Sequence, residues 1–358
     1  MYKKIYFNRS IYNIAFLYIV LIFIKFSTTA AFANSFKISD IEISKPYDLN
    51  FKKEEVIEIA FEKAFQELIF KLTTLNSNKV AKIIKPNTAK GLIESFSIVN
   101  EQFIDKKYIA KFNVEFNKRE VFKFLEKNNI FPSIPIKKNI FIMPILIETN
   151  KDEILMYREN AFFENWNKNI KKYHLLTYVL PNEDIEDFNI LKRNLNKIEE
   201  YNFDEIRTKY ALDDFIILII FKNNNEIKTL SKIFLNKNKV ILNKKFEYNN
   251  EIKNDEVENI IKTLKLDFEN QWKKINLINT SIKLQISLSV DTNDYKLIQK
   301  LENNLSNLDF VSSFNIDNYS NKRTIYKVKY NSSPNRLIEQ LKKNNFNVEA
   351  SNNIWMIK

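Results

Sequence analysis

A single glycine, Gly91, stands in a chain of 358 residues that also contains no cysteine and one histidine. Phosphate-binding loops of the GxGxxG and GxxxxGK[ST] types are therefore excluded. Most zinc and copper sites are excluded as well, because they need cysteine or several histidines. Turns that require positive φ have to use asparagine, which tolerates this conformation better than other non-glycine residues. We expect such turns at Asn223–Asn225 and Asn352–Asn353.

The first 33 residues have the pattern of an export signal. A basic start precedes an apolar run of 14 residues, Ile11–Ile24, and the segment ends in Ala31-Phe32-Ala33, a small-x-small cleavage pattern. The run is shorter than the roughly 20 apolar residues of a membrane-spanning helix. We expect cleavage after Ala33 and an exported, periplasmic protein. The alternative is an uncleaved signal, in which residues 11–24 anchor the chain to the inner membrane and Lys25 snorkels to the surface.

The formal net charge is +12, and four basic residues of the signal leave +8 on the mature chain. A basic surface attracts nucleic acid, anionic lipid or cell-wall polymer. However, lysine, asparagine, isoleucine and phenylalanine all have A/T-rich codons, so codon bias explains the lysine content equally well. We therefore expect no nucleic-acid partner in the periplasm and no cofactor.

Alternating strand and helix patterns predict an α+β / α/β protein of three small modules after the signal peptide, residues 1–33. The modules and their linker are an N-terminal α+β domain (34–130), a Pro-containing linker (131–138), a middle α/β domain (139–278) and a C-terminal ferredoxin-like domain (279–358).

Hydrophobic periodicity predicts the elements of the first two modules. In the N-terminal module these are strands at 36–43, 91–100 and 108–116, a turn at 103–107, and helices at 54–75 and 119–128. In the middle module they are strands at 139–147, 175–180 and 215–221, a hairpin of 230–235 with 240–248, and helices at 161–171, 188–210 and 255–275.

The apolar pattern of residues 279–358 predicts the element order βαββαβ, which is the ferredoxin-like arrangement. Strands are expected at 282–290, 311–316, 324–330 and 346–357, the last one broken at Asn352–Asn353. Pro334 should open the final helix, with Ser333 as its cap. Because Lys283, Gln285 and Ser287 point outward from the first strand, an RNA-binding surface with exposed aromatic residues is disfavoured.

Two stretches of the sequence form a recognisable pattern together with single positions elsewhere: the strand pair Leu92–Asn117 and the segment Leu180–Asp187. This pattern resembles the bacterial family called domain of unknown function 2066. The family-motif positions are Pro144, Asn160, Trp166, Pro181, Asp184, Asp187 and Tyr210. The chain departs from the family at Ala161-Phe162 and Glu183. The resemblance implies an exported envelope protein, mostly of Gram-negative bacteria, with no established activity.

The carboxylates Glu183, Asp184, Glu186 and Asp187 form the strongest candidate site. Four acids in five positions suit Ca²⁺ or Mg²⁺, and paired carboxylates suit glycoside hydrolysis. The structural alternative is that acids after Pro181 cap the following helix and complement its dipole. The spacing favours the cap over a metal or catalytic site.

Three other groups are weaker candidates. Asp213-Asp214 fit a solvated turn better than a ligand site, and His174, beside two lysines, fits a surface position better than a general base. Trp166, with Phe162 and Phe163, fits core packing better than a pocket, and the same applies to the other two tryptophans, Trp272 and Trp355.

The sequence therefore favours a non-enzymatic interaction or assembly factor of the cell envelope, with envelope proteins as partners. The alternative is a carboxylate-based enzyme or divalent-cation binder that acts on an envelope polymer through Glu183–Asp187.

Overall fold

The structure is a computed structural model that describes residues 36–84, 87–248, 252–278, 283–308, 310–350 and 353–358. The predicted export signal lies outside these residues. The chain divides into two compact units, the first formed by residues up to 64 with 87–118 and the second by 65–86 with 119–358. The described residues form both helices and three sheets, which confirms the predicted α+β / α/β class. None of the helices described is long and apolar enough to cross a membrane.

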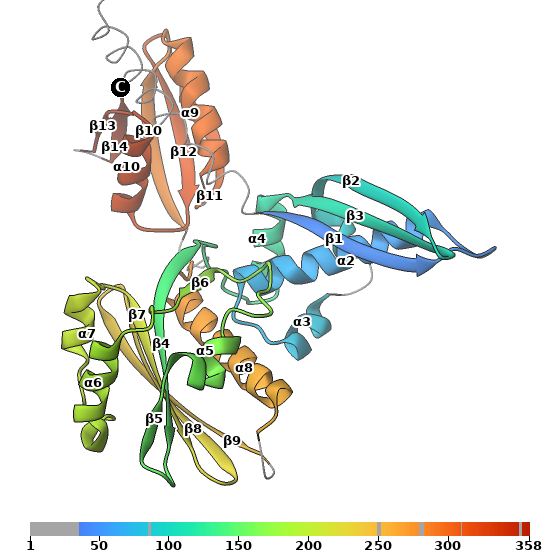
Figure 1. Ribbon diagram of the computed structural model, residues 1–358. Helices are drawn as coiled ribbons and strands as arrows, with labels where there is room; N and C mark the ends of the chain where they lie inside the picture. Colours follow the sequence, from blue (N-terminus) through green and yellow to red (C-terminus); the bar gives the residue numbers. More distant parts are fainter. Residues whose placement is uncertain (1–35, 85–86, 249–251, 279–282, 309, 351–352) are drawn as a thin grey trace, which may run out of the picture. The chain divides into compact units, whose positions relative to one another are not determined.

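The first unit is a three-stranded antiparallel sheet with one face covered by a helix (Figure 1). The strands are β1 (Lys37–Pro46), β2 (Ile93–Ile104) and β3 (Lys107–Phe116), in the order β1-β3-β2, and α2 (Lys53–Leu72) starts in this unit. Alternate side chains of β3 are buried, as the period-two pattern predicts. The predicted turn at 103–107 is too long, because β2 continues through Ile104 and only Asp105 and Lys106 have positive φ.

The middle of the second unit is a six-stranded mixed sheet between two layers of helices (Figure 1). Strands β4 and β7 are parallel neighbours and read as continuous apolar runs because both of their faces are buried. One face packs against α5 and α8, and the other packs against α6 and α7. The strands are β4 (Lys138–Glu148), β5 (Glu153–Leu155), β6 (Leu176–Val179), β7 (Phe215–Lys222), β8 (Glu226–Leu235) and β9 (Asn238–Glu247). The helices are α5 (Ala161–Asn165), α6 (Ile185–Arg193), α7 (Asp204–Lys209) and α8 (Asn254–Ile275).

Two predicted helices of this region are wrong in length. The helix expected at 161–171 ends at Asn165, whose side chain donates to the carbonyl of Ala161, and Asn169 further on has positive φ. The helix expected at 188–210 consists of α6, the 3₁₀ turn Leu195–Lys197 and α7. The break before α7 falls at Phe203, which has a φ of 60°. Apolar spacing alone did not reveal these breaks.

The last sheet has the strand order β11-β12-β10-β14-β13, with β10 parallel to β14. Its elements are β10 (Leu284–Asp291), α9 (Tyr295–Asn307), β11 (Val311–Tyr319), β12 (Arg323–Tyr330), α10 (Pro334–Lys343), β13 (Val348–Glu349) and β14 (Ile354–Ile357). The predicted order βαββαβ is thus present, with β13 and β14 in place of one last strand, and the break expected at Asn352–Asn353 lies partly outside the described residues. Pro334 opens α10 and Ser333 occupies its N-cap position, as predicted, although the Ser333 side chain makes no capping hydrogen bond.

Asparagine supplies five of the positive-φ residues in the described chain, and aspartate supplies three. The hairpin between β8 and β9 turns at Asn236 and Lys237, which both have positive φ, as a two-residue type I′ turn requires. The run Asn223–Asn225 has none, so the expectation there is wrong. Two helices, α3 (Ser77–Ile83) and α4 (Lys118–Lys127), complete the described helices.

Candidate functional site

The acidic cluster lies at the N-terminus of α6 and surrounds one lysine from α7. The Nζ atom of Lys209 lies 2.6 Å from Asp184 Oδ2, 2.7 Å from Asp187 Oδ1 and 3.1 Å from Glu186 Oε2. Asp184 also accepts a hydrogen bond from the backbone N–H of Glu186, 2.7 Å, as the N-cap of α6. The predicted capping role of Asp184 is therefore confirmed.

Asp187 is the buried member of the cluster, with no exposed surface. Its Oδ2 accepts a hydrogen bond of 2.6 Å from the Tyr210 hydroxyl and a longer one, 3.5 Å, from the Tyr157 hydroxyl. The Tyr157 hydroxyl also donates to the backbone carbonyl of Asp184. Asp187 thus has an ammonium on one oxygen and phenols on the other, which compensates the burial of its charge.

Electrostatics in the cluster favour its ionised form. Hydrogen bonding to Lys209 lowers the pKa of Asp184, and the backbone N–H of Glu186 acts in the same direction. Burial alone would lower the pKa of Lys209, but the hydrogen bonds that its ammonium donates to three carboxylates raise it well above its usual range. Burial raises the pKa of Tyr157 to about 12, and burial together with Asp187 raises that of Tyr210 further.

Glu183 does not join this cluster. Its carboxylate pairs with Arg158 at 2.9 Å, and both side chains are more than half exposed. In the part of the chain that the structure describes, no group of three or more His, Cys, Asp or Glu side chains is arranged to hold a metal ion. The four acids are therefore distributed between an exposed ion pair and a helix cap that closes on Lys209.

The other motif positions have structural roles in the same layered region. Asn160 is buried. Its amide donates to the carbonyl of Pro144 on β4, 3.1 Å, and its side-chain oxygen accepts from the backbone N–H of Phe162, 2.9 Å. This side chain caps α5 and ties it to the sheet. Pro181 is buried just before the acidic segment.

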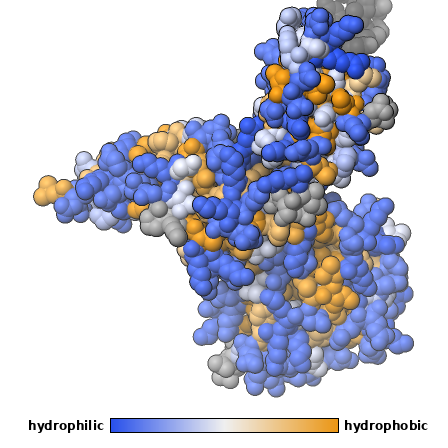
Figure 2. Space-filling model, turned by 180° about the vertical axis from the view of Figure 1, so that it is seen from behind, coloured by the Kyte–Doolittle hydropathy of each residue, from blue (hydrophilic) through white to orange (hydrophobic). Residues whose placement is uncertain are grey.

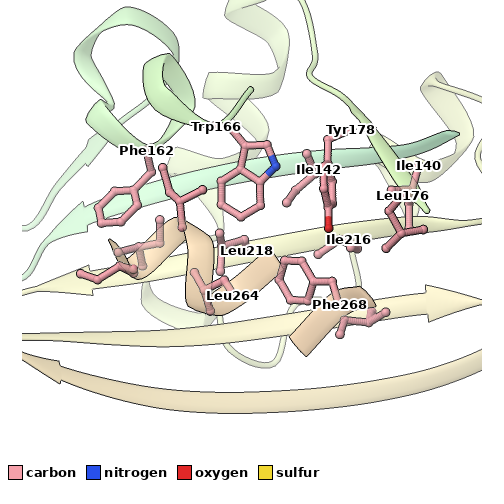
Figure 3. Close-up of a cluster of buried hydrophobic side chains, with 14 of the residues drawn as sticks. Ile140, Ile142, Phe162, Trp166, Leu176, Tyr178, Ile216, Leu218, Leu264 and Phe268 are labelled. Atoms are coloured by element: carbon pink, nitrogen blue, oxygen red, sulfur yellow. The ribbon is translucent and has the colours of Figure 1, made fainter. Parts of the chain in front are cut away.

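Trp166 belongs to the hydrophobic core between α5, α8 and the sheet (Figure 3). Its ring meets Tyr178 edge-on, with centroids 5.6 Å apart, and stacks on Phe268 at 6.2 Å. Phe162 is also buried there. The packing interpretation of the aromatic residues on α5 is thus confirmed. It also holds for Trp272, which is 4% exposed, whereas Trp355 is only partly buried.

Sequence reasoning missed a row of buried charges on α8, at a spacing of four residues. Glu269 is 1% exposed and accepts hydrogen bonds from the backbone N–H groups of Leu175 and Leu176 at the start of β6. Lys265 and Lys273 stand one turn away on either side, and burial lowers the pKa of both, that of Lys265 to about 8. In the sequence, these buried charges could have been recognised by their i, i+4, i+8 spacing within the apolar stripe of the helix.

Among these buried charges, Lys265 has the fewest hydrogen-bond partners. Its Nζ has no hydrogen-bond partner among the described residues, and it lies 5.8 Å from the Trp166 ring and 5.5 Å from the Tyr178 ring. Two aromatic faces therefore take the place of hydrogen bonds around this ammonium.

His174 and the aspartate pair differ from the expected surface positions. His174 is only partly exposed, and burial together with Lys265 and Lys273 lowers its pKa to about 4. Asp213 is exposed, but Asp214 accepts from the backbone N–H of Asn236 and pairs with Lys138 at 2.6 Å. The solvated-turn interpretation is therefore wrong for Asp214.

Comparisons with known proteins add no relative. No protein-family model matches the chain, and no curated protein matches it.

Proposed function

We propose that this chain is an exported protein of the cell envelope that acts through protein–protein contacts, as a non-enzymatic interaction or assembly factor. The observation that carries the proposal is the edge strand β2. Phe96, Val99, Phe103 and Ile104 on this strand are each 46–59% exposed. Apolar side chains gathered along an unpaired strand edge are typical of a surface that another chain covers.

The N-terminal sequence and the resemblance to the domain of unknown function 2066 support a periplasmic location in a Gram-negative bacterium. The arrangement of the acidic cluster supports a structural role for Asp184 and Asp187 over the alternative of a carboxylate-based enzyme, because Lys209 already occupies the space between their carboxylates.

The proposal is tested by affinity capture from envelope extracts. The purified protein should recover a specific envelope protein, and the variant Phe103→Lys should lose it. A matched control is Ile316→Lys, which changes an equally exposed side chain (52%) on the edge strand β11 of the last sheet. Failure of the native chain to recover any reproducible partner would contradict the interaction role.

A further inference from the structure

The outer edge of β2 is long and unpaired. β2 spans 12 residues and pairs only with β3 among the strands that the structure describes. In the space-filling view, hydrophobic side chains reach the surface along the upper margin of this unit, where Figure 1 places β2 (Figure 2). Such an edge presents free backbone N–H and C=O groups together with apolar side chains.

A bulge in the middle of β2 gives this edge an unusual pattern. Ile98 faces Phe112 and Asn100 faces Lys111, so Val99 is the additional residue. The β2 residues opposite the buried positions of β3 are Ile93, Phe96, Ile98, Glu101 and Phe103. The four from Phe96 to Phe103 form a set that is symmetric about the point between Val99 and Asn100.

Two aromatic residues lie at the ends of this symmetric set. The Phe96 ring meets Phe61 of α2 edge-on, with centroids 5.0 Å apart. The Phe103 ring packs against Tyr47 at 4.9 Å and Tyr108 at 5.2 Å. Each phenylalanine therefore has one face held by its own unit while about half of its surface is exposed.

We propose that β2 pairs antiparallel with β2 of a second copy of this chain, about a two-fold axis that passes between Val99 and Asn100. This inference deepens the proposed interaction role and rests on it. In this register Phe96 of one copy faces Phe103 of the other, and Ile98 faces Glu101. Because the axis is perpendicular to the sheet, the two α2 helices stand on the same side, and the phenylalanine pairs lie in the groove between them.

The bulge is the reason to choose a second copy over another strand. If a strand without a bulge paired with β2, its side chains would lie on the same face of the sheet as those of the opposing β2 residues up to Val99. Beyond Val99 they would lie on the opposite face. A second β2 carries the same bulge at the opposing position, so residues of the helix-covered face meet each other from Phe96 to Phe103, up to the second register shift of β2 between Ile93 and Ser95. In this register Glu94 of one copy faces Asp105 in the turn of the other, and this turn has a net positive charge because Lys106 and Lys107 follow Asp105.

Cysteine cross-linking tests the register without background, since the chain has no cysteine of its own. Ser97 and Gln102 lie on the sheet face away from α2, are exposed, and face each other in the proposed register. An equal mixture of the variants Ser97→Cys and Gln102→Cys should form a disulfide-linked dimer. Ser97→Cys alone should not, because its two copies would be about 17 Å apart, five residues along the strand.

A matched control places the second cysteine on the opposite edge of the same sheet. Ser44→Cys, on the exposed face of β1, should form no cross-link when mixed with Gln102→Cys. In sedimentation velocity the native protein should have twice the mass of one chain at micromolar concentration. Phe103→Lys should reduce the dimer fraction at least tenfold, whereas Ile316→Lys should leave it unchanged.

The proposal is overturned if the mixture of Ser97→Cys and Gln102→Cys gives no more dimer than either variant alone, or if the native protein sediments as a single chain. If the chain is a monomer and Phe103→Lys still abolishes capture of an envelope protein, self-pairing is refuted and the interaction function stands. If the cross-link forms in the predicted register but no envelope protein is captured, self-pairing stands and the wider function fails.

Discussion

Replacing Lys209 by methionine removes the one ammonium shared by three carboxylates and should destabilise the second unit. The largest effect comes from Asp187, which is fully buried and 2.7 Å from Lys209 Nζ. Removing one partner of a buried ion pair costs about 3–5 kcal/mol. Here the phenols of Tyr210 and Tyr157 remain, and Lys209 is itself 26% exposed, so we expect a loss of about 2–3 kcal/mol.

Urea denaturation followed by circular dichroism measures this loss as a lower midpoint with an unchanged slope. The control is Arg158→Met, which removes the exposed pair with Glu183 and should cost less than about 0.5 kcal/mol. Adding Asp187→Asn to Lys209→Met removes the uncompensated charge and should recover at least half of the lost stability. The reasoning is refuted if Lys209→Met costs no more than Arg158→Met, or if the second substitution lowers stability further.

Three further predictions concern other buried polar groups. His174 has a folded pKa of about 4, below its unfolded value of 6.5, so the unfolded state takes up its proton first as the pH falls. Stability should therefore drop by about 2–3 kcal/mol between pH 6.5 and 4, and His174→Gln should abolish this part of the pH dependence in urea titrations, whereas an unchanged profile would refute it. Asn160→Ala removes the α5 cap and the bond to Pro144 and should lower stability by about 1–3 kcal/mol; a neutral result in thermal unfolding would contradict the role given to this side chain. Glu269→Leu leaves two buried backbone N–H groups, one of them on Leu175, without an acceptor and should cost about 3–5 kcal/mol. Glu269→Gln should be less damaging, and equal stability of both variants would show that the hydrogen bonds do not matter.

Much of the fold could be predicted because the period of the apolar residues along the sequence indicates which segments form strands and which form helices. The strict alternation of β3 and the continuous apolar runs of β4 and β7 placed those strands within one or two residues. The helices at 161–171 and 188–210 could not be placed correctly. Their ends depend on local conformations, such as the positive φ at Phe203, that an apolar pattern does not record.

The candidate site was predicted in part. The capping role of Asp184 follows from its position before a helix, and the structure shows it. Lys209 was not foreseen, because it is 22 residues from Asp187 and only the packing of α7 beside α6 brings the two together. The buried charges of α8 were missed for a related reason: Glu269 is satisfied by backbone N–H groups 93 and 94 residues away.

The parallel pairing of β4 with β7 has a consequence for how quickly the chain folds. Paired residues such as Glu148 and Lys222 are 74 positions apart, and the segment between them supplies two further strands and three helices of the same layers. Contacts over such separations form slowly, because the entropy of closing the loop is lost before the sheet gains its stability. A central sheet that forms late keeps the chain unfolded for longer, and an unfolded chain is what the predicted export signal of residues 1–33 would require.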